Sequence, residues 1–280
     1  MWSIGIYFGQ SPFELEPAPG FVNPVLTRDN VSDVAAKFVA DPFMLNVNGL
    51  WHMFFEVMNR ETRKGEIGLA TSGNGLHWEY RQIVLAERFH LSYPYVFEWN
   101  HEYYMIPETF EPGKIRLYKS VAFPCQWSFV RSLVTGRYAD PSVFYFANRW
   151  WMFVCATPQR HDSLRLYFAE DIMGLWVEHP ASPIIEDNAR KARPAGRVLV
   201  LADKIIRFTQ DCVPHYGTQV RAFEISELTT SRYLETENPN SPILTPSGAG
   251  WNEVGMHHID PHLLSGGQWM ACVDGLSPVE

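Results

Sequence analysis

Three stretches decide the fold: ADPFMLNVNGLWHMFFE (Ala40–Glu56), SYPYVFEWNHEYYMIPE (Ser92–Glu108) and ADPSVFYFANRWWMFVCA (Ala139–Ala156). Each contains a proline, an apolar run, a turn and a second apolar run rich in Trp, Tyr and Met. A fainter copy begins at Ala192 and a clear one at Ile259, so the phrase occurs five times, at intervals of roughly fifty residues. Short strands repeated in this way are typical of a β-propeller with one blade per repeat.

The rest of each repeat supplies two outer strands. A third strand follows the phrase, as at Gly65–Ser72, and a fourth follows that, which gives four strands per blade. The fifth phrase has no outer strands after it, but Trp2–Leu26 resembles the missing pair. We therefore expect one all-β domain over residues 1–280, a five-bladed β-propeller. Its N-terminal strands complete the C-terminal blade and remove the open sheet edge. The alternative is an ordinary β-sandwich with coincidental repeats.

The composition excludes several classes of protein. The net charge is −8 and there is no Lys/Arg-rich run, which argues against nucleic-acid binding. No apolar stretch has the length of a membrane span. The N-terminus lacks the features of a signal peptide, so we expect a cytoplasmic protein. The four cysteines show no CxxC spacing and are interpreted as thiols. The oligomeric state is left open.

Acidic residues gather at one end of the repeated hairpin. Strand A starts and strand B ends at the same face of an antiparallel blade, so the residues there share one mouth of the central funnel. At the start of strand A, before the proline, stand Asp41, Tyr93, Asp140, Arg193 and Asp260. At the end of strand B stand Glu56, Glu108 and Cys155, with Gln210, Asp211 and Asp274 near the corresponding place.

Convergent carboxyl groups suit glycoside chemistry. An inverting glycosidase needs one carboxylate to activate water and one protonated carboxyl to donate to the leaving oxygen. Burial and neighbouring like charges can keep a proton on one group and off the other at neutral pH. Tyr93, Tyr95 and Trp99 are candidates for stacking on sugar faces.

The motifs resemble a known group of propellers. ADPF, SYPYVF and ADPSVF, each followed by a Trp/Tyr/Met-rich strand, resemble the five-bladed propeller glycosidases of family 43 and the related families 32, 62, 68, 117 and 130. The resemblance is closer to the N-terminal domain of plant glucosamine inositolphosphorylceramide transferase and its bacterial stand-alone relatives. The shared phrases are YYMIPE, DPSVF with RWWMF, ARPAGR, TQDC with YG, and GMHHID, which together cover most of the chain.

The resemblance to family 43 implies roles for individual residues. Its general base falls on Asp41 and its auxiliary Asp on Asp140. Its general acid is a Glu opening the fourth blade, where this chain has Ala192-Arg193-Pro194-Ala195 instead. We expect Glu108 to supply the proton, with Glu56 and Asp211 as alternatives. The resemblance also places a fifth-blade histidine near a central water or Ca²⁺, for which His257 and His258 are candidates.

The sequence thus predicts a carbohydrate-active propeller that cleaves or transfers a glycosidic, perhaps furanosidic, bond. Its catalytic residues are expected to be Asp41, Glu108 and Asp140, and its ligand a glycan or sugar-containing small molecule. The expected substrate-binding residues are Glu56, Tyr93, Arg193, Gln210, Asp211, His258 and Asp260. No catalytic metal or required cofactor is expected, and a structural Ca²⁺ in the central channel is left open. The alternatives are a non-catalytic glycan-binding domain of polysaccharide or glycolipid biosynthesis and, more weakly, a protein-interaction propeller.

Overall fold

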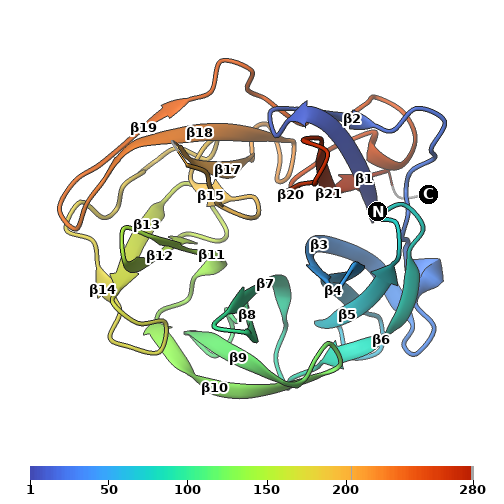
Figure 1. Cartoon of the computed structure of the whole chain (residues 1–280), viewed down its shortest axis with the longest axis horizontal. Helices are drawn as coiled ribbons and strands as arrows, with labels where there is room; N and C mark the ends of the chain where they lie inside the picture. The colour runs from blue at the N-terminus through green and yellow to red at the C-terminus, as the bar shows by residue number, and fades with distance from the viewer. Residues whose placement is uncertain (203, 279–280) are drawn as a thin grey trace.

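Each of the five repeats folds into one antiparallel sheet, and the sheets stand side by side around a central axis (Figure 1). The coordinates are a computed structural model that describes residues 1–202 and 204–278. The fold predicted from the repeat is therefore confirmed as an all-β, five-bladed propeller. Apart from strands, the described ranges contain two 3-10 turns, η1 (Arg28–Asn30) and η2 (Gly250–Asn252). None of the described helical segments is long and apolar enough to cross a membrane.

The first three blades each use four consecutive strands. Blade 1 is β3 (Ala36–Val47), β4 (Leu50–Asn59), β5 (Lys64–Ser72) and β6 (Glu79–Leu85). Blade 2 is β7 (Ser92–Trp99), β8 (Glu102–Glu108), β9 (Lys114–Ala122) and β10 (Gln126–Thr135). Blade 3 is β11 (Ala139–Phe146), β12 (Arg149–Cys155), β13 (Leu164–Ala169) and β14 (Val177–Glu178).

Blade 4 is the irregular one, as its faint repeat suggests. Its innermost strand is split into β15 (Arg193–Pro194) and β16 (Leu199–Val200), which both pair with β17 (Ile205–Asp211). The outer strands are β18 (Gln219–Leu228) and β19 (Tyr233–Glu237). Between the two short pieces, Gly196 has φ 132° and lies against blade 5, where an added Cβ would come within 1.8 Å of the Ile259 carbonyl oxygen. Only glycine fits this approach.

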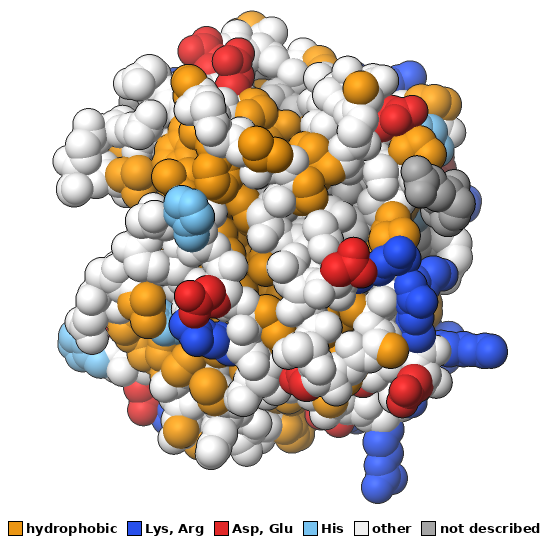
Figure 2. All heavy atoms as spheres, turned by 90° about the vertical axis from the view of Figure 1, so that its right-hand side faces the viewer, with side chains coloured by type: hydrophobic (Ala, Val, Ile, Leu, Met, Phe, Trp, Pro, Cys, Tyr) orange, Lys and Arg blue, Asp and Glu red, His pale blue; other side chains and the backbone are white. Residues whose placement is uncertain are grey.

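Blade 5 closes the ring as predicted. Its inner strands are β20 (Ile259–Leu263) and β21 (Trp269–Leu276), and its outer strands are β1 (Trp2–Ser11) and β2 (Glu14–Pro17). The pairing of β1 with β21 runs in register from Trp2 opposite Leu276 to Gly9 opposite Trp269. Figure 2 shows the side of the molecule where the chain ends lie, with Lys and Arg side chains gathered near one edge beside hydrophobic atoms.

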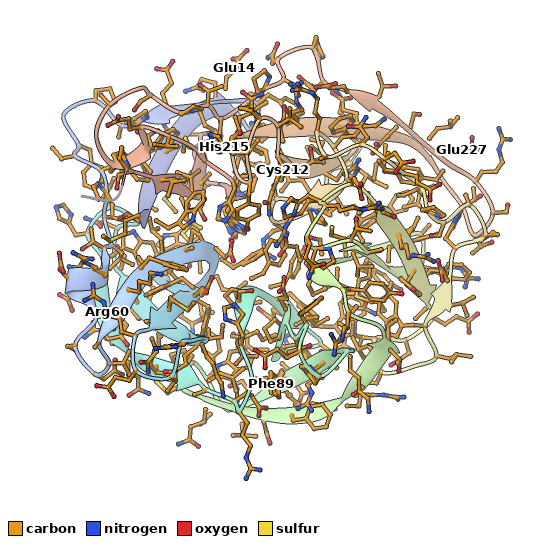
Figure 3. All side chains as sticks on the ribbon, turned by 180° about the vertical axis from the view of Figure 1, so that it is seen from behind. Glu14, Arg60, Phe89, Cys212, His215 and Glu227 are labelled. Atoms are coloured by element: carbon orange, nitrogen blue, oxygen red, sulfur yellow. The ribbon has the colours of Figure 1, made fainter. Side chains whose placement is uncertain are left out.

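Aromatic side chains fill the space between blades. Trp150 and Trp151 are 4% and 1% exposed, so both rings are buried. Trp150 lies 4.8 Å from Trp99 of blade 2, measured between ring centroids. Seen from behind, side chains also reach the middle of the ring (Figure 3). The four cysteines are free thiols, as expected.

Candidate active site

The prolines that mark the repeat belong to β-bulges in the first three blades. In blade 1 the pairing of β3 with β4 shifts between Ala40, opposite Glu56, and Phe43, opposite Phe54, so two residues face one. The same shift follows Ser92 in blade 2 and Ala139 in blade 3. Proline is tolerated at a bulge because no ladder hydrogen bond is needed there.

The first residue of each bulge has a left-handed backbone. The φ angles are 52° at Asp41, 47° at Tyr93 and 51° at Asp140. A non-glycine residue in this region carries strain of about 1–3 kcal/mol and needs compensating contacts. Such strain is concentrated at functional sites in general, so three equivalent outliers around one channel mark its mouth as the candidate site.

Carboxylates from the preceding blade satisfy the backbone at each bulge. The Asp41 N–H donates to Asp274 of blade 5 (3.1 Å), and the Tyr93 N–H donates to Asp41 (3.2 Å). The Asp140 N–H donates to Glu108 of blade 2 (3.3 Å). The acidic residues thus connect neighbouring blades around the channel and compensate the strained backbone.

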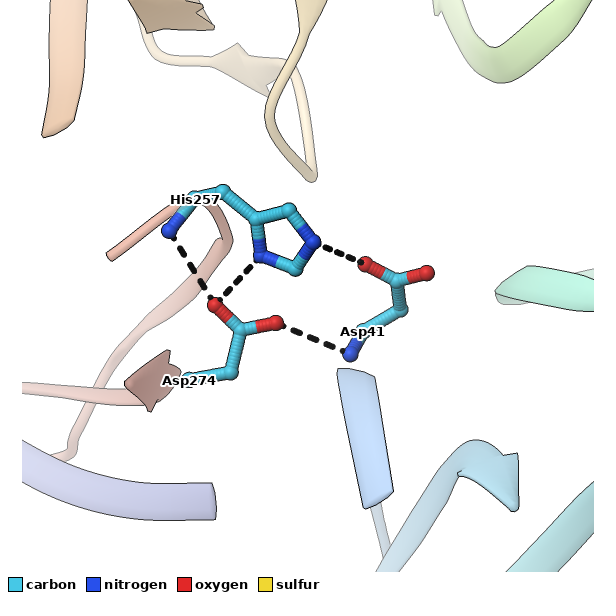
Figure 4. A group of neighbouring side chains, drawn as sticks. All are labelled: Asp41, His257 and Asp274. Atoms are coloured by element: carbon cyan, nitrogen blue, oxygen red, sulfur yellow. Dashed lines mark hydrogen bonds and ion pairs between the residues drawn. The ribbon is translucent and has the colours of Figure 1, made fainter. Parts of the chain in front are cut away.

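Asp41 faces a paired histidine and carboxylate (Figure 4). His257 Nδ1 lies 2.7 Å from Asp274 Oδ1, and its Nε2 lies 3.7 Å from Asp41 Oδ1. Burial raises the pKa of Asp41 to about 7; His257 opposes the rise, and Asp274 and Asp140 add to it. Burial alone would lower the pKa of His257, but the Asp274 carboxylate outweighs it and the pKa is raised.

Glu108 and Asp140 share the guanidinium of Arg193. Arg193 Nε donates to Asp140 Oδ2 at 2.6 Å, and its Nη2 lies 3.8 Å from Glu108 Oε2. Gln210 donates to the same Asp140 oxygen at 2.9 Å. Burial first, and then the charge of Asp140, raises the pKa of Glu108 well above its ordinary value, against the opposing effect of Arg193. The structure therefore brings Asp41, Glu108 and Asp140 to the same end of the channel.

Glu56 is a fourth carboxyl of this cluster. It is 6% exposed and lies 3.5 Å from His90 Nε2, while His90 Nδ1 accepts from the Gly65 N–H at 2.8 Å. Burial, followed by the charges of Asp41 and Glu108, raises the pKa of Glu56 well above its usual range. Glu56 and Glu108 are thus two carboxyl groups beside Asp41 whose pKa values burial raises above the ordinary range.

Two predicted substrate contacts are corrected to structural ion pairs. Asp260 is fully buried and binds Arg197, and His262 Nε2 lies 2.9 Å from Asp260 Oδ2. Arg197 also donates to the Val96 carbonyl at 3.0 Å. Asp211 is also fully buried and is held by Arg190 (3.2 Å) and Arg221 (2.8 Å). Side chains alternate along a strand, so Asp211 and its neighbour Gln210 point to opposite sides.

The predicted aromatic platforms are also corrected. Tyr93 and Tyr95 are 0% and 2% exposed, and the Tyr93 hydroxyl bonds to Ser142 (2.7 Å) and Gly196 (3.1 Å) inside the channel. Trp99 ends β7, at the opposite end of the blade from the carboxyl groups. Neither a buried ring nor a ring at the far end can stack on a sugar at this mouth.

Sequence reasoning missed the aromatic residues that do stand at the mouth. The Tyr216 ring is 37% exposed and lies 4.9 Å from the Arg193 guanidinium. Trp2 stacks on His257, with ring centroids 3.9 Å apart and an angle of 15° between planes. His161 Nδ1 accepts from Arg193 Nη1 at 2.9 Å, and burial together with Arg193 lowers the pKa of His161 to about 4. Among the sequence signals, the YG of the TQDC phrase points to Tyr216.

Within the part of the chain that the structure describes, one set of residues in the channel could hold a metal. Ligand atoms of Asp41, His257 and Asp274 lie within 4.8 Å of one another. Burial lowers the pKa of His258 to about 4, and its ring, 3.8 Å from Asp41, has no hydrogen-bond partner among the described residues. Calcium takes six to eight oxygen ligands, whereas this set contains one imidazole, that of His257, and an Asp274 whose oxygens already accept hydrogen bonds. The residues fit Ca²⁺ poorly.

Solved structures share the fold at low sequence identity. The catalytic domain of a family 62 α-L-arabinofuranosidase from Coprinopsis cinerea matches with a TM-score of 0.64 and 11% identity, over 85% of this chain and 81% of that one. A glycosyl hydrolase from Bacteroides ovatus matches with a TM-score of 0.64 and 10% identity, over 91% and 92% of the two chains. These similarities establish the propeller architecture.

Sequence relatives are considerably closer. Glucosamine inositolphosphorylceramide transferase 1 of Oryza sativa subsp. japonica is 33% identical over 295 aligned residues, which cover 98% of this chain and 40% of the rice protein. The chain thus spans about two fifths of the length of this curated relative. Residues 1–276 match the family described as the N-terminal part of glucosamine inositolphosphorylceramide transferase 1, and the chain belongs to that family.

Proposed function

We propose that this propeller is carbohydrate-active and cleaves or transfers a glycosidic bond at the funnel mouth. The observation that carries the proposal is the meeting of Asp41, Glu108 and Asp140, from three blades, at one end of the channel. Two of these carboxyl groups have different charged neighbours, His257 beside Asp41 and Arg193 beside Glu108. The pKa of Asp41 is about 7, whereas that of Glu108 is raised well above its ordinary range.

The two groups have complementary roles at neutral pH. Glu108 keeps its proton and donates it to the glycosidic oxygen as the bond from that oxygen to the anomeric carbon breaks. Ionised Asp41 takes a proton from the water, or from the sugar hydroxyl in a transfer, that forms the new bond to the same carbon. Asp140 makes no proton transfer; held by Arg193 and Gln210, it fixes Glu108 and raises its pKa. Tyr216 is the exposed ring for the sugar face.

The test compares turnover in Asp41→Asn with that of the wild type. A panel of chromogenic pyranosides and furanosides is the substrate, with glucosaminyl donors added because the printed name of the relatives contains glucosamine. We expect Asp41→Asn to lose roughly 10²–10⁴-fold in turnover. Its melting temperature at pH 4, where Asp41 of the folded wild type is also uncharged, should change little, because asparagine also tolerates the left-handed backbone. Turnover at the wild-type level in a folded Asp41→Asn protein would rule out this mechanism.

One observation favours a second candidate, a glycan-binding domain without catalysis. Where family 43 enzymes are expected to carry their acid, Arg193 stands here and ties up Asp140, and Asp140 is only 2% exposed. A buried ion pair such as Arg193–Asp140 suits a rigid glycan-binding surface as well as a catalytic site. Glycan-array binding with no turnover of any bound glycan, by wild type and Glu108→Gln alike, would favour this candidate over the enzyme.

A further inference from the structure

A second recess lies beside the carboxyl cluster, at the junction of blades 5 and 1. It has a volume of about 510 Å³. Its walls combine apolar and cationic side chains, namely Trp2, Phe38, Leu276, Arg28, Lys37 and Arg60. None of the described residues that line it is acidic, although the chain as a whole carries a net charge of −8.

The recess opens at the same end of the propeller as the catalytic cluster. Lys37 and Phe38 precede Asp41 on β3, and Arg60 directly follows β4, which carries Glu56. Figure 3 places Arg60 beside the strands of blade 1. Trp2 is common to both sites, because its ring lines the recess and also stacks on His257, 3.7 Å from Asp41. The stacked rings of Trp2 and His257 therefore lie between a ligand in the recess and the proposed base.

The cations of the recess are largely uncompensated. In the described ranges, neither Lys37 nor Arg60 forms an ion pair with a carboxylate, and both are exposed. Arg28 lies 3.5 Å from Asp29, whose side chain is 85% exposed, so solvent screens that pair. Three positive charges in a concave, partly apolar pocket form an attractive site for an anion.

We propose that this recess is a subsite for a phosphate ester carried by the sugar-containing ligand. The proposal deepens the proposed function and rests on it for the sugar part of the ligand. A phosphate presents three strong acceptor oxygens, which matches three separate cations better than the two oxygens of a carboxylate do. The cations also hold the anion apart from Asp41, whose charge when ionised would otherwise repel it. Trp2 and Phe38 provide apolar contact for the carbon skeleton.

The experiment measures binding directly and requires no turnover. Inorganic phosphate, glucose 1-phosphate, glucuronate and methyl glucoside are titrated into the whole chain and followed by calorimetry and ³¹P NMR. We expect both phosphates to bind, more weakly at high salt, and glucose 1-phosphate to bind at least tenfold more tightly than glucuronate or methyl glucoside. In Lys37→Gln and Arg60→Gln, affinity for glucose 1-phosphate should each fall about tenfold, the equivalent of about 1.4 kcal/mol.

Lys114→Gln is the matched control, because Lys114 is exposed at the start of β9 in blade 2 and does not line the recess. If Lys114→Gln lost as much affinity for glucose 1-phosphate as the recess variants, the attraction would come from the general charge of this side of the protein, and the subsite would be overturned. Equal affinity for glucuronate and glucose 1-phosphate would overturn the assignment to phosphate. Unchanged affinity in the Lys37 and Arg60 variants would overturn the location.

Failure of this proposal and failure of the proposed function are distinguishable. In Asp41→Asn, phosphate binding should persist while turnover is lost, because Asp41 is separated from the recess by Trp2 and His257. A wild-type chain that binds phosphate but turns over no substrate contradicts only the reaction. Turnover of neutral glycosides without any binding of phosphate would contradict only the proposed phosphate subsite.

Discussion

The inner strand begins with the same residue pattern in all five blades but with two different backbones. In blades 1, 2 and 3 the residue before the proline lies in a bulge with a left-handed backbone, and its N–H is held by a carboxylate of the preceding blade. In blades 4 and 5 the corresponding residues, Arg193 and Asp260, pair in regular register with Gln210 and Cys272.

The difference in backbone distinguishes acidic residues of the candidate site from acidic residues that hold the blades together. Asp41 and Asp140, at two of the bulges, face the carboxyl cluster of the channel mouth. Asp260, in the regular strand of blade 5, accepts a hydrogen bond from the Met44 N–H and binds Arg197, so it joins blade 5 to blades 1 and 4. An acidic residue before a proline thus has a site role only where the bulge turns it into the channel. The predictions that follow test this division.

The largest expected effect is the loss of Asp260. Asp260→Ala leaves the buried Arg197 guanidinium without its partner, and breaking a buried pair in this way costs about 3–5 kcal/mol. Urea unfolding at pH 4, where Asp41 of the folded wild type is still protonated, should show this loss, whereas Asp41→Asn should lie within about 1 kcal/mol of the wild type. Glu170→Ala is the control, since its pair with Arg149 is exposed and contributes about 0–1 kcal/mol. An Asp260→Ala protein as stable as this control would contradict the architectural role.

The second prediction concerns stability as a function of pH. The pKa of Asp41 rises from 3.8 to about 7 on folding, so between these values the folded state binds more protons than the unfolded state. Stability must therefore fall as the pH rises from about 4 to about 7. Glu56 and Glu108 shift in the same direction. The pKa of Asp260 is lowered instead, so its stabilising contribution is complete above about pH 4 and is constant across this window.

Asp41→Asn removes one of the groups that take up a proton. Its stability should decline less than that of the wild type over the same window, by roughly 3 kcal/mol, since the pKa of Asp41 rises by about three units on folding and each unit corresponds to about 1.4 kcal/mol. The measurement is the urea midpoint at several pH values, with the exposed Glu170→Gln as a variant that should keep the wild-type slope. A wild-type slope in Asp41→Asn would mean that Asp41 titrates normally and has no perturbed environment.

Much of the fold was predictable because the signal is repeated. Five copies of one hairpin phrase predict five blades, and the unmatched strands at the two ends predict the ring closure by β1 and β2. The spacing from the proline to the end of strand B also predicts that Glu108 and Asp140 meet at one mouth. These inferences depend only on strand direction and hydrophobic pattern, which the sequence encodes locally.

The incorrect assignments depend on features that the sequence encodes only jointly. Asp260 precedes a proline just as Asp41 does, but a bulge depends on how the strand pairs with its neighbour. Asp211 stands next to Gln210, and a register difference of one residue turns it away from the channel. Trp2 and Tyr216 reach the mouth only after the ring closes, because one comes from the first strand and the other from a loop of blade 4.

The smallest expected effect is also the most specific test of the comparison. Asp140 and Arg193 are the two partners of one ion pair, so replacing either of them by Ala or Gly removes the same interaction. The difference between the Gly and Ala variants at each position then reports on the backbone alone. At Asp140, where φ is 51°, glycine relieves strain, and Asp140→Gly should be more stable than Asp140→Ala by about 1 kcal/mol.

At Arg193, in a regular strand, the order should reverse. Glycine loses more conformational entropy there, so Arg193→Gly should be less stable than Arg193→Ala by roughly 0.5–1 kcal/mol. Urea unfolding of the four variants measures both differences without any substrate. Differences of the same sign at both positions would mean that the bulge does not distinguish the first three blades from the last two. Gly–Ala stability differences of opposite sign would show that the strained backbone is a feature of the blades that carry the candidate carboxyl groups.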